Sequence, residues 1–386
     1  MKKLVLWMCV VLLVACTTGQ KEDLTASGLK RSHFQTEVSG KKTDLFVLKN
    51  KNGMEVCVTN FGGRIVSVLV PDKEGMMRDV VLGFDSIQDY LRFPSDLGAT
   101  IGRYANRINQ GRFVLDGTEY QLSQNNYGHC LHGGPRGFQY RVFDGLQKND
   151  RELQLTYLAK DGEEGFPGNL NCKVTMTLTD DNSIHIQYEA DTDKPTIINM
   201  TNHSYFNLDG DPSKNNSDYL LTVDADYYTP VDSTFMTTGE LAAVDGTPMD
   251  FRTPAAIGSR MNLDFEQLKN GHGFDHNWVL NTEEDITRSC ATLESPATGI
   301  ILDVYTNEPG IQIYTGNFLD GTLTGKKGFV YDHRASVCLE TQKYPDTPNK
   351  PEWPSVILEP GQTYKEATGY KAVLTNPVVS TVITVV

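Results

Sequence analysis

The sequence lacks an excess of positive charge. Its 386 residues include 35 lysines and arginines against 49 aspartates and glutamates, which gives a formal net charge of −14 at pH 7. Because nucleic-acid binding requires a basic surface, this balance argues against nucleic acid as a partner. It also argues against a phosphorylated substrate, whereas a neutral ligand meets no such penalty.

The cysteines lack the close spacing of a metal site. No CxxC pair occurs among the five that follow Cys16, which are Cys57, Cys130, Cys172, Cys290 and Cys338. An odd and widely spaced set indicates neither a zinc site nor a dense disulfide framework. We expect most of these side chains to be buried as small hydrophobic residues.

The N-terminus lacks a hydrophobic run long enough to cross a membrane. The run LVLWMCVVLLVA has 12 residues and ends at Ala15, whereas a membrane-spanning helix needs about 20. Preceded by Lys2 and Lys3, it is typical of a signal peptide. The closing LVAC resembles a bacterial lipoprotein signal, in which Cys16 becomes the lipid-carrying first residue. The alternative is an ordinary signal peptide with an incidental cysteine.

This signal predicts an exported bacterial lipoprotein that is held at a membrane by lipid rather than by a helix. Thr17 is not the aspartate that favours retention at the inner membrane, so we expect the outer membrane, facing the periplasm. We expect three segments: a signal peptide over 1–16 ending at the lipidated cysteine, a polar tether over 17–32, and a single domain over 33–386.

Helical periodicity is scarce, and period-two alternation dominates instead. In VTMTLT (174–179), Val174, Met176 and Leu178 share one face and threonines the other; IHIQYEA (184–190) follows the same rule. Glycine- and asparagine-rich turns separate these runs. The pattern predicts an antiparallel all-β protein, a large sandwich with one solvated face per strand. A short helix over 85–91, capped by Asp85, is the main exception.

Two glycine-flanked stretches carry candidate ligand-binding residues. In GRYANRI (102–108), Asn106 and Arg107 are either donors for substrate hydroxyls or part of a salt-bridged surface loop. In HCLHGGPRGF (129–138), His132 precedes two glycines, which let a backbone or a ligand approach closely. An HxxH pair in a loop is weak evidence for a metal site.

Histidine, tyrosine and aspartate mark two further stretches. TNHSYFNL (201–208) places His203 two residues before Tyr205, so the two side chains share a face if the segment is extended. Aromatic rings and an imidazole suit a sugar, but a structural histidine is the alternative. In GTPMDFR (246–252), Asp250 follows a turn and is either a ligand contact or a capping aspartate.

Two late strands present polar side chains opposite apolar ones. In IQIYTGNFLDG, Ile311 and Ile313 share a face, so Gln312 and Tyr314 point to the other side. In SVCLETQ, Glu340 is likewise opposite the face of Val337 and Leu339. Each polar side chain lies either in a concave groove or in solvent.

In their order along the chain, these motifs resemble the aldose 1-epimerases, also called galactose mutarotases. The resemblance covers roughly residues 34–370 and rests on GRYANRI, LHGG, GEEGFPGNL, TNHSYFNL, GTPMDFR, GFDHNW, YTGNFLDG and CLETQKYPD. It implies a large antiparallel β-supersandwich with the sugar in an open groove. It also implies interconversion of the α and β anomers of free aldoses such as galactose and glucose.

The resemblance also assigns roles. It implies that His203 is the general acid, that Glu340 is the general base, and that His132 helps to polarise the ring oxygen. The implied sugar contacts are Asn106, Arg107, His132, Tyr205, Asp250 and Gln312. Mutarotation needs one acid and one base across the anomeric centre, with no redox agent, nucleophile or metal. We therefore expect no cofactor and no catalytic metal, leaving a structural cation open, and a monomer.

Four alternatives use the same residues differently. A hexose-6-phosphate epimerase would need extra cationic groups, and a non-catalytic sugar-binding lipoprotein would not need both His203 and Glu340. A glycoside hydrolase would need two carboxylates, nominally Glu340 and Asp250. A metal enzyme built on His272 and His276 is the weakest, because HGFDH is better explained as a structural motif.

Overall fold

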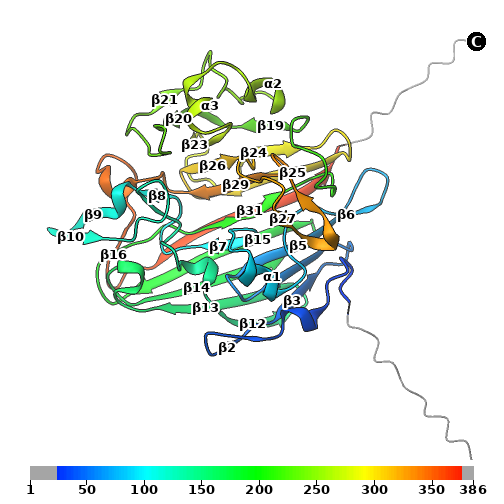
Figure 1. Ribbon diagram of the computed structural model, residues 1–386, viewed down its shortest axis with the longest axis horizontal. Helices are drawn as coiled ribbons and strands as arrows, with labels where there is room; N and C mark the ends of the chain where they lie inside the picture. Colours follow the sequence, from blue (N-terminus) through cyan, green and yellow to red (C-terminus); the bar gives the residue numbers. More distant parts are fainter. Residues whose placement is uncertain (1–23, 376–386) are drawn as a thin grey trace, which may run out of the picture.

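The computed structural model describes residues 24–375, which form a sandwich of antiparallel sheets (Figure 1). One layer is a nine-stranded sheet. Its spatial order is β12 (Asp144–Asn149), β13 (Glu152–Ala159), β14 (Leu170–Leu178), β15 (Ser183–Thr192), β31 (Tyr364–Leu374), β25 (Ile300–Thr306), β24 (Ser289–Glu294), β19 (Leu220–Val223) and β22 (Ala255–Ala256).

Two smaller sheets make up the facing layer. The six-stranded sheet runs β18 (Tyr205–Phe206), β29 (Val337–Gln342), β26 (Gly310–Tyr314), β23 (Asp275–Leu280), β20 (Ala225–Thr229) and β21 (Ala242–Ala243). The four-stranded sheet runs β3 (Leu45–Lys49), β4 (Glu55–Thr59), β5 (Arg64–Pro71) and β6 (Met77–Asp79). A bridge between Val81 and Phe206 joins the two sheets. The predicted all-β sandwich is confirmed.

Short strand pairs and helices complete the described part of the chain. The pairs are β17 (Thr201–His203) with β7 (Ala99–Ile101), β11 (Cys130–Leu131) with β8 (Arg107–Ile108), β9 (Arg112–Leu115) with β10 (Thr118–Gln121), β1 (Glu37–Val38) with β2 (Lys41–Lys42), β16 (Thr196–Ile197) with β30 (Ile357–Leu358), and β27 (Leu323–Thr324) with β28 (Val330–Tyr331). The α-helices are α1 (Ile87–Arg92), α2 (Gly258–Met261) and α3 (Glu266–Asn270).

The predicted helix near residue 85 forms, but its cap differs from the prediction. Ser86, not Asp85, is the N-cap residue, and its hydroxyl accepts a hydrogen bond from the Asp89 N–H. This bond satisfies one of the backbone donors that the first turn leaves without a helical partner. No helix among residues 24–375 has the length and apolar content to cross a bilayer.

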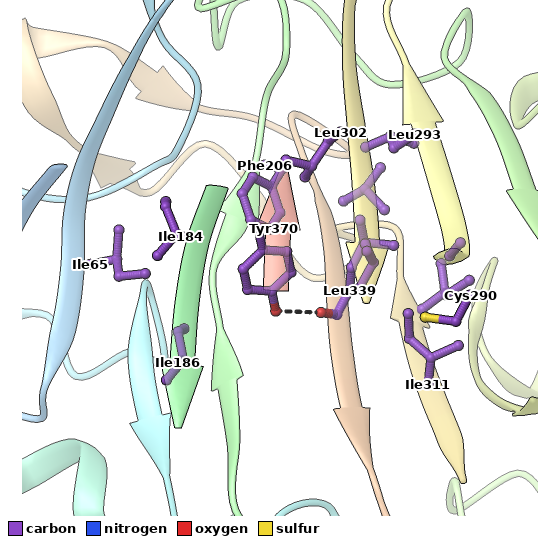
Figure 2. Close-up of a cluster of buried hydrophobic side chains, with 14 of the residues drawn as sticks. Ile65, Ile184, Ile186, Phe206, Cys290, Leu293, Leu302, Ile311, Leu339 and Tyr370 are labelled. Carbon is purple, nitrogen blue, oxygen red and sulfur yellow. Dashed lines mark hydrogen bonds between the residues drawn. The ribbon is translucent and has the colours of Figure 1, made fainter. Parts of the chain in front are cut away.

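The alternating strands bury their apolar faces between the layers, as predicted. Val174, Met176 and Leu178 are all buried. Figure 2 shows the centre of this core, where the Tyr370 hydroxyl of β31 donates to the Leu339 carbonyl of β29 over 2.7 Å. The bond lets a buried phenol span the two layers without an unsatisfied polar group. All five cysteines after Cys16 are unpaired and buried, as expected.

Part of the expected tether belongs to the folded domain. Leu29 is 2% exposed. The N–H groups of Ala26 and Ser27 both donate to the buried Glu55 carboxylate, each over 3.1 Å. Residues 24–32 are therefore packed rather than extended as a linker, because Leu29 and the Glu55 carboxylate fix them to β4. The expected signal peptide with Cys16, and residues 17–23 of the tether, lie outside the described residues.

The described C-terminal residues belong to a central strand. Residues 371–374 continue β31, which lies between β15 and β25 in the middle of the nine-stranded sheet. Thr375 follows, and its N–H donates to the Gly299 carbonyl over 2.9 Å. The apolar character of this segment therefore reflects a central strand that is covered by neighbours. Residues 376–386 lie outside the described residues.

Candidate active site

Strand alternation brings two predicted site residues together on the outer face of the six-stranded sheet. Gln312 of β26 lies directly opposite Glu340 of β29 in the antiparallel register. Their neighbours Ile311 and Leu339 point into the core, as Figure 2 shows. The predicted orientation of both polar side chains is therefore confirmed, and the groove is the outer surface of these strands.

His203 contacts Glu340 directly. It ends the short strand β17, and its Nε2 atom lies 3.4 Å from Glu340 Oε1. The Tyr205 ring stacks on the imidazole with ring centroids 5.0 Å apart. Phe206 instead packs in the core against Tyr370. The motif TNHSYFNL thus divides as its alternation predicts, with His203 and Tyr205 on the site face and Phe206 behind them.

His132 and Asn106 fix one another in place. The Asn106 N–H donates to His132 Nδ1 over 3.1 Å, and the His132 N–H donates to the Asn106 carbonyl over 3.2 Å. Both residues have left-handed backbones, with φ of +64° and +53°. Because Nδ1 accepts a hydrogen bond, the neutral imidazole carries its proton on Nε2. His132 is therefore a fixed hydrogen-bond donor whose ring lies 5.2 Å from that of His203.

The double glycine after His132 makes this arrangement sterically possible. Gly133 has φ of +78°, and a Cβ atom there would collide with the Gly102 carbonyl oxygen. Gly134 has φ of +95°, and a Cβ atom would lie 2.8 Å from the Glu164 carboxylate. The close approach that the sequence predicts for these glycines is confirmed: the partner is the Gly102 backbone for Gly133 and the Glu164 side chain for Gly134.

Arg107 is buried and held from two sides. Its Nε donates to Asn126 Oδ1 over 3.0 Å, and its guanidinium carbon lies 4.7 Å from the centroid of the Phe235 ring. Burial lowers the pKa of Arg107, whereas the nearby Asp275 opposes that shift. The guanidinium stays charged at neutral pH because its reference pKa is so high.

These side chains surround a cavity of about 280 Å³. That volume lies just below the usual range for drug-sized ligands and suits a single small ring. The lining residues are Asp96, Asn106, Arg107, Asn126, Tyr127, Leu131, His132, His203, Tyr205, Asp275, Gln312, Tyr314, Phe318 and Glu340. Seven of the eight residues expected at the site therefore lie together, although the chain separates them widely.

Burial pushes the proton affinities of the acid–base pair towards each other. Burial raises the pKa of Glu340 well above its usual value, and the charges of Asp275 and Asp96 raise it further. Burial lowers the pKa of His203, and Asp96 opposes that shift. The pKa of His132 is lowered well below its usual range by burial, then by His203 and Arg107. His132 is therefore neutral, which agrees with its hydrogen bonding.

Asp250 does not lie at this cavity, which corrects the expectation from GTPMDFR. Its carboxylate accepts two hydrogen bonds from the Arg252 guanidinium, over 2.9 and 2.7 Å. That pairing engages the carboxylate outside the cavity. Asp275 takes the expected place instead. It is buried in β23 and accepts from Gln312 Nε2 over 2.7 Å.

Besides Asp275, six residues that line the cavity were not predicted as site residues: Asp96, Asn126, Tyr127, Leu131, Tyr314 and Phe318. The alternation of IQIYT places Tyr314 on the same face of β26 as Gln312, but the sequence assigns it no role. Asn126, Tyr127 and Asp96 come from loops without a periodic signal, so their position depends on tertiary packing alone.

Two sets of side chains in the cavity have the composition of metal ligands. Asp96, His132 and His203 form one set, and His203, Cys338 and Glu340 form the other; within each set the donor atoms lie within 4.8 Å of one another. Both sets use His203, so an ion in either would occupy a group needed for proton transfer. His272 and His276, the weakest metal candidates, belong to neither set. His276 Nδ1 instead accepts from the Asp275 N–H over 3.1 Å.

Known proteins resemble this chain in sequence and in fold. Residues 44–371 match the family described as aldose 1-epimerase. A human galactose mutarotase is 44% identical over 318 residues, covering 82% of this chain and 91% of the relative. An aldose 1-epimerase from Escherichia coli strain K12 is 40% identical over 334 residues, covering 86% and 96%.

Solved structures agree with the sequence comparison. An aldose epimerase homologue from C. elegans superposes with a TM-score of 0.81 at 32% identity, covering 86% of this chain and 100% of the other. A galactose 1-epimerase from Lactobacillus acidophilus NCFM gives a TM-score of 0.78 at 31% identity, covering 89% and 98%. The likeness thus extends over nearly the whole of each relative.

Proposed function

This chain belongs to the aldose 1-epimerase family, and from that premise we propose that it interconverts the α and β anomers of free aldohexoses such as galactose and glucose. It is an isomerase acting on carbohydrates. The observation that carries the proposal is the buried pair of His203 and Glu340, whose reactive atoms lie 3.4 Å apart within a cavity sized for one ring.

The reaction opens and recloses a hemiacetal. The Glu340 carboxylate takes the proton from the anomeric hydroxyl, and His203 gives a proton to the ring oxygen as its bond to the anomeric carbon breaks. The free aldehyde rotates about its first carbon–carbon bond. Reclosure from the other face returns the ring-oxygen proton to His203 and the Glu340 proton to the anomeric oxygen, so each group ends as it began.

The electrostatics of the cavity suit this reversible exchange. A carboxyl group with a raised pKa is a stronger base, and an imidazolium with a lowered pKa is a stronger acid. Both shifts favour moving one proton from the acid to the base, through the sugar, compared with the same groups in water. Reclosure returns both protons, so the same pair serves both anomers.

The remaining side chains are proposed to orient the sugar. His132 offers its Nε2–H group to the ring oxygen, and Arg107 and Asn106 donate to hydroxyl groups. Tyr205 stands beside His203, and Gln312 hydrogen-bonds to Asp275, which we propose as the sugar-binding aspartate in place of Asp250. Holding the sugar ring in the correct position relative to the acid and the base contributes a large share of the reduction in the activation barrier. The proposed chemistry requires no cofactor.

A phosphorylated sugar is a poorer candidate substrate. The cavity is lined by three carboxylates, Asp96, Asp275 and Glu340, against a single guanidinium from Arg107. A phosphate dianion would lose water and meet net repulsion there. A sugar-binding protein without catalysis would have no reason to bury an acid and a base in contact.

Polarimetry tests the proposal. Purified protein should accelerate the decay of optical rotation of fresh α-glucose or α-galactose well beyond the buffer rate. Glu340→Gln and His203→Asn should each reduce turnover on the order of 100- to 10,000-fold. The proposal fails if wild-type protein gives no acceleration, and the role assignments fail if either variant retains full turnover.

We further propose that the chain is exported and anchored through a lipid on Cys16, facing the periplasm at the outer membrane. The composition of residues 1–16 supports this, and the folded domain needs no apolar contact of its own to reach the membrane. Labelling cells with a radioactive fatty acid should label the wild-type protein but not the Cys16→Ser variant. Equal labelling of both would refute the anchor.

A further inference from the structure

Four rings form a contiguous group at the mouth of the cavity, which we call the aromatic rim: Tyr127, Phe235, His272 and Phe318. Phe235 is at the centre, with ring centroids 5.2 Å from Tyr127, 5.7 Å from Phe318 and 5.8 Å from His272. His272 and Phe318 close the group over 5.6 Å. The rim is therefore one packed unit drawn from four separate loops.

The outer rings of the rim face solvent. Tyr127 is 54% exposed and Phe318 is 48% exposed, whereas Phe235 beneath them is buried. Single exposed apolar residues are ordinary on protein surfaces. Contiguous rings that also line a cavity are not, and such patches mark binding sites. Tyr127 and Phe318 both line the cavity that holds the acid–base pair.

Three of the four rim residues have strained backbones. Tyr127, Phe235 and His272 have φ of +46°, +65° and +55°. Left-handed backbone is uncommon for residues other than glycine and is an outlier for bulky ones. Such a backbone costs free energy and persists only where the surroundings enforce it, most often at functional sites. Packing alone gives no reason to place three such residues in one ring cluster.

The rim lies one ring beyond the reacting groups. The His203 ring is 6.4 Å from the Tyr314 ring, which stacks on Phe318 over 6.3 Å. The Phe318 N–H also donates to the Tyr314 hydroxyl over 2.9 Å, which fixes the rim to the floor of the cavity. A bound sugar must place its anomeric carbon at His203 and Glu340. Any group attached to its far end then leaves through the mouth, where the rim stands.

We propose that the aromatic rim is a second sugar-binding subsite, which receives the neighbouring pyranose when the reacting sugar is the reducing end of a disaccharide. This inference rests on the proposed mutarotase function and assigns residues outside the reacting pair to substrate selection. The apolar face of the second ring packs on Tyr127 and Phe318. The Tyr127 hydroxyl and the exposed His272 imidazole supply polar contacts at its edge. The glycosidic bond is untouched, and only the reducing-end hemiacetal opens.

The test compares sugars that share the reacting ring. Glucose, cellobiose, maltose and lactose all present a glucose hemiacetal, so polarimetry can measure kcat/KM for the same reaction with and without a second ring. Tyr127→Ala and Phe318→Ala should each lower the ratio of disaccharide to glucose kcat/KM about tenfold, as expected for losing one ring face of buried apolar contact. Tyr227→Ala and Phe329→Ala remove similarly exposed rings outside the cavity, and should leave that ratio unchanged.

Calorimetry separates this inference from the proposed function. Methyl β-cellobioside and methyl β-glucoside cannot mutarotate, because the anomeric oxygen is blocked, yet both can bind. The cellobioside should bind more tightly to the wild-type protein, and the rim variants should remove the difference. Equal affinities, or a ratio of kcat/KM that both rim variants leave unchanged, would overturn the subsite. Absence of glucose turnover would refute the mutarotase proposal while the binding comparison still decides on the rim.

Discussion

Replacing Asp96 with asparagine should shift the pH profile of catalysis to lower pH. Asp96 lines the cavity, and its carboxylate lies within 4.8 Å of a ring nitrogen of His203. Its negative charge raises the pKa of both His203 and Glu340. The other ionisable groups that line the cavity around this pair are Arg107, Tyr127, His132, Tyr205, Asp275 and Tyr314, with Cys338 and Arg64 behind it. All of these remain in the variant.

The size of the shift follows from the geometry. Two unit charges about 4.8 Å apart interact by about 0.9 kcal/mol at a dielectric constant of about 80, and by about 3.5 kcal/mol at about 20. Asp96 is partly exposed, so solvent screening favours the lower half of that range, about 1–2 kcal/mol. At 1.36 kcal/mol for each pH unit, the expected shift is about 0.7–1.5 pH units.

The direction follows from the proton count. The active pair holds one proton, and activity is lost when the pair gains a second proton or loses the one it has. A negative charge favours the protonated form at both steps, so removing it lowers both apparent pKa values. Both limbs of the bell-shaped profile should therefore move to lower pH together.

Initial rates of mutarotation over about pH 5 to 9, corrected for the buffer rate, measure this shift. Asp116→Asn makes the same chemical change at an exposed turn outside the cavity and should leave the profile in place. An Asp96→Asn profile that stays at the wild-type position, or moves to higher pH, would refute the electrostatic reasoning.

Two further predictions follow from the aspartates and from the double glycine. Asp275→Asn should lower kcat/KM about 10- to 100-fold, because it weakens hydrogen bonds to a buried charge. Asp250→Asn should change kcat/KM less than about twofold, because that carboxylate pairs with Arg252 outside the cavity. Comparable losses in the two variants would argue against Asp275 as the sugar-binding aspartate. Gly133→Ala should lower the free energy of unfolding by more than about 1 kcal/mol beyond the loss in Gly117→Ala, measured by denaturant titration, because both glycines have left-handed backbones but only Gly133 would also collide with the Gly102 carbonyl. Equal losses would show that no collision occurs.

Strand alternation predicted the fold and the face of several site residues. The patterns around Gln312, Glu340 and His203 place one residue in two against the core, and burial of the apolar half is the largest favourable term in folding. Because β26 buries Ile311 and Ile313, its Gln312 must point outward. Because β29 buries Leu339, its Glu340 must point outward as well. Register between neighbouring strands then brings these side chains together.

The failure with Asp250 has a physical cause. Its motif lies in a loop, where no periodicity constrains the side chain, and Arg252 two residues away captures the carboxylate. Asp275 was overlooked because every residue of β23 except Val279 is buried, so no polar and exposed face stands out in DHNWVL. Which side of that strand faces the cavity is decided by its pairing with β26, information that no single strand contains.

The site combines rigid strands with strained loops, and the two supply different functions. His203, Gln312 and Glu340 project from hydrogen-bonded strands, which hold an acid and a base in the fixed geometry that proton transfer requires. Asn106 and His132, like three of the four residues of the aromatic rim, have left-handed backbones, whose cost the core must offset. Changes in the loops should therefore act mainly on KM and on the choice of sugar. Changes to His203 or Glu340 should act mainly on kcat, since these two groups move protons in the transition state.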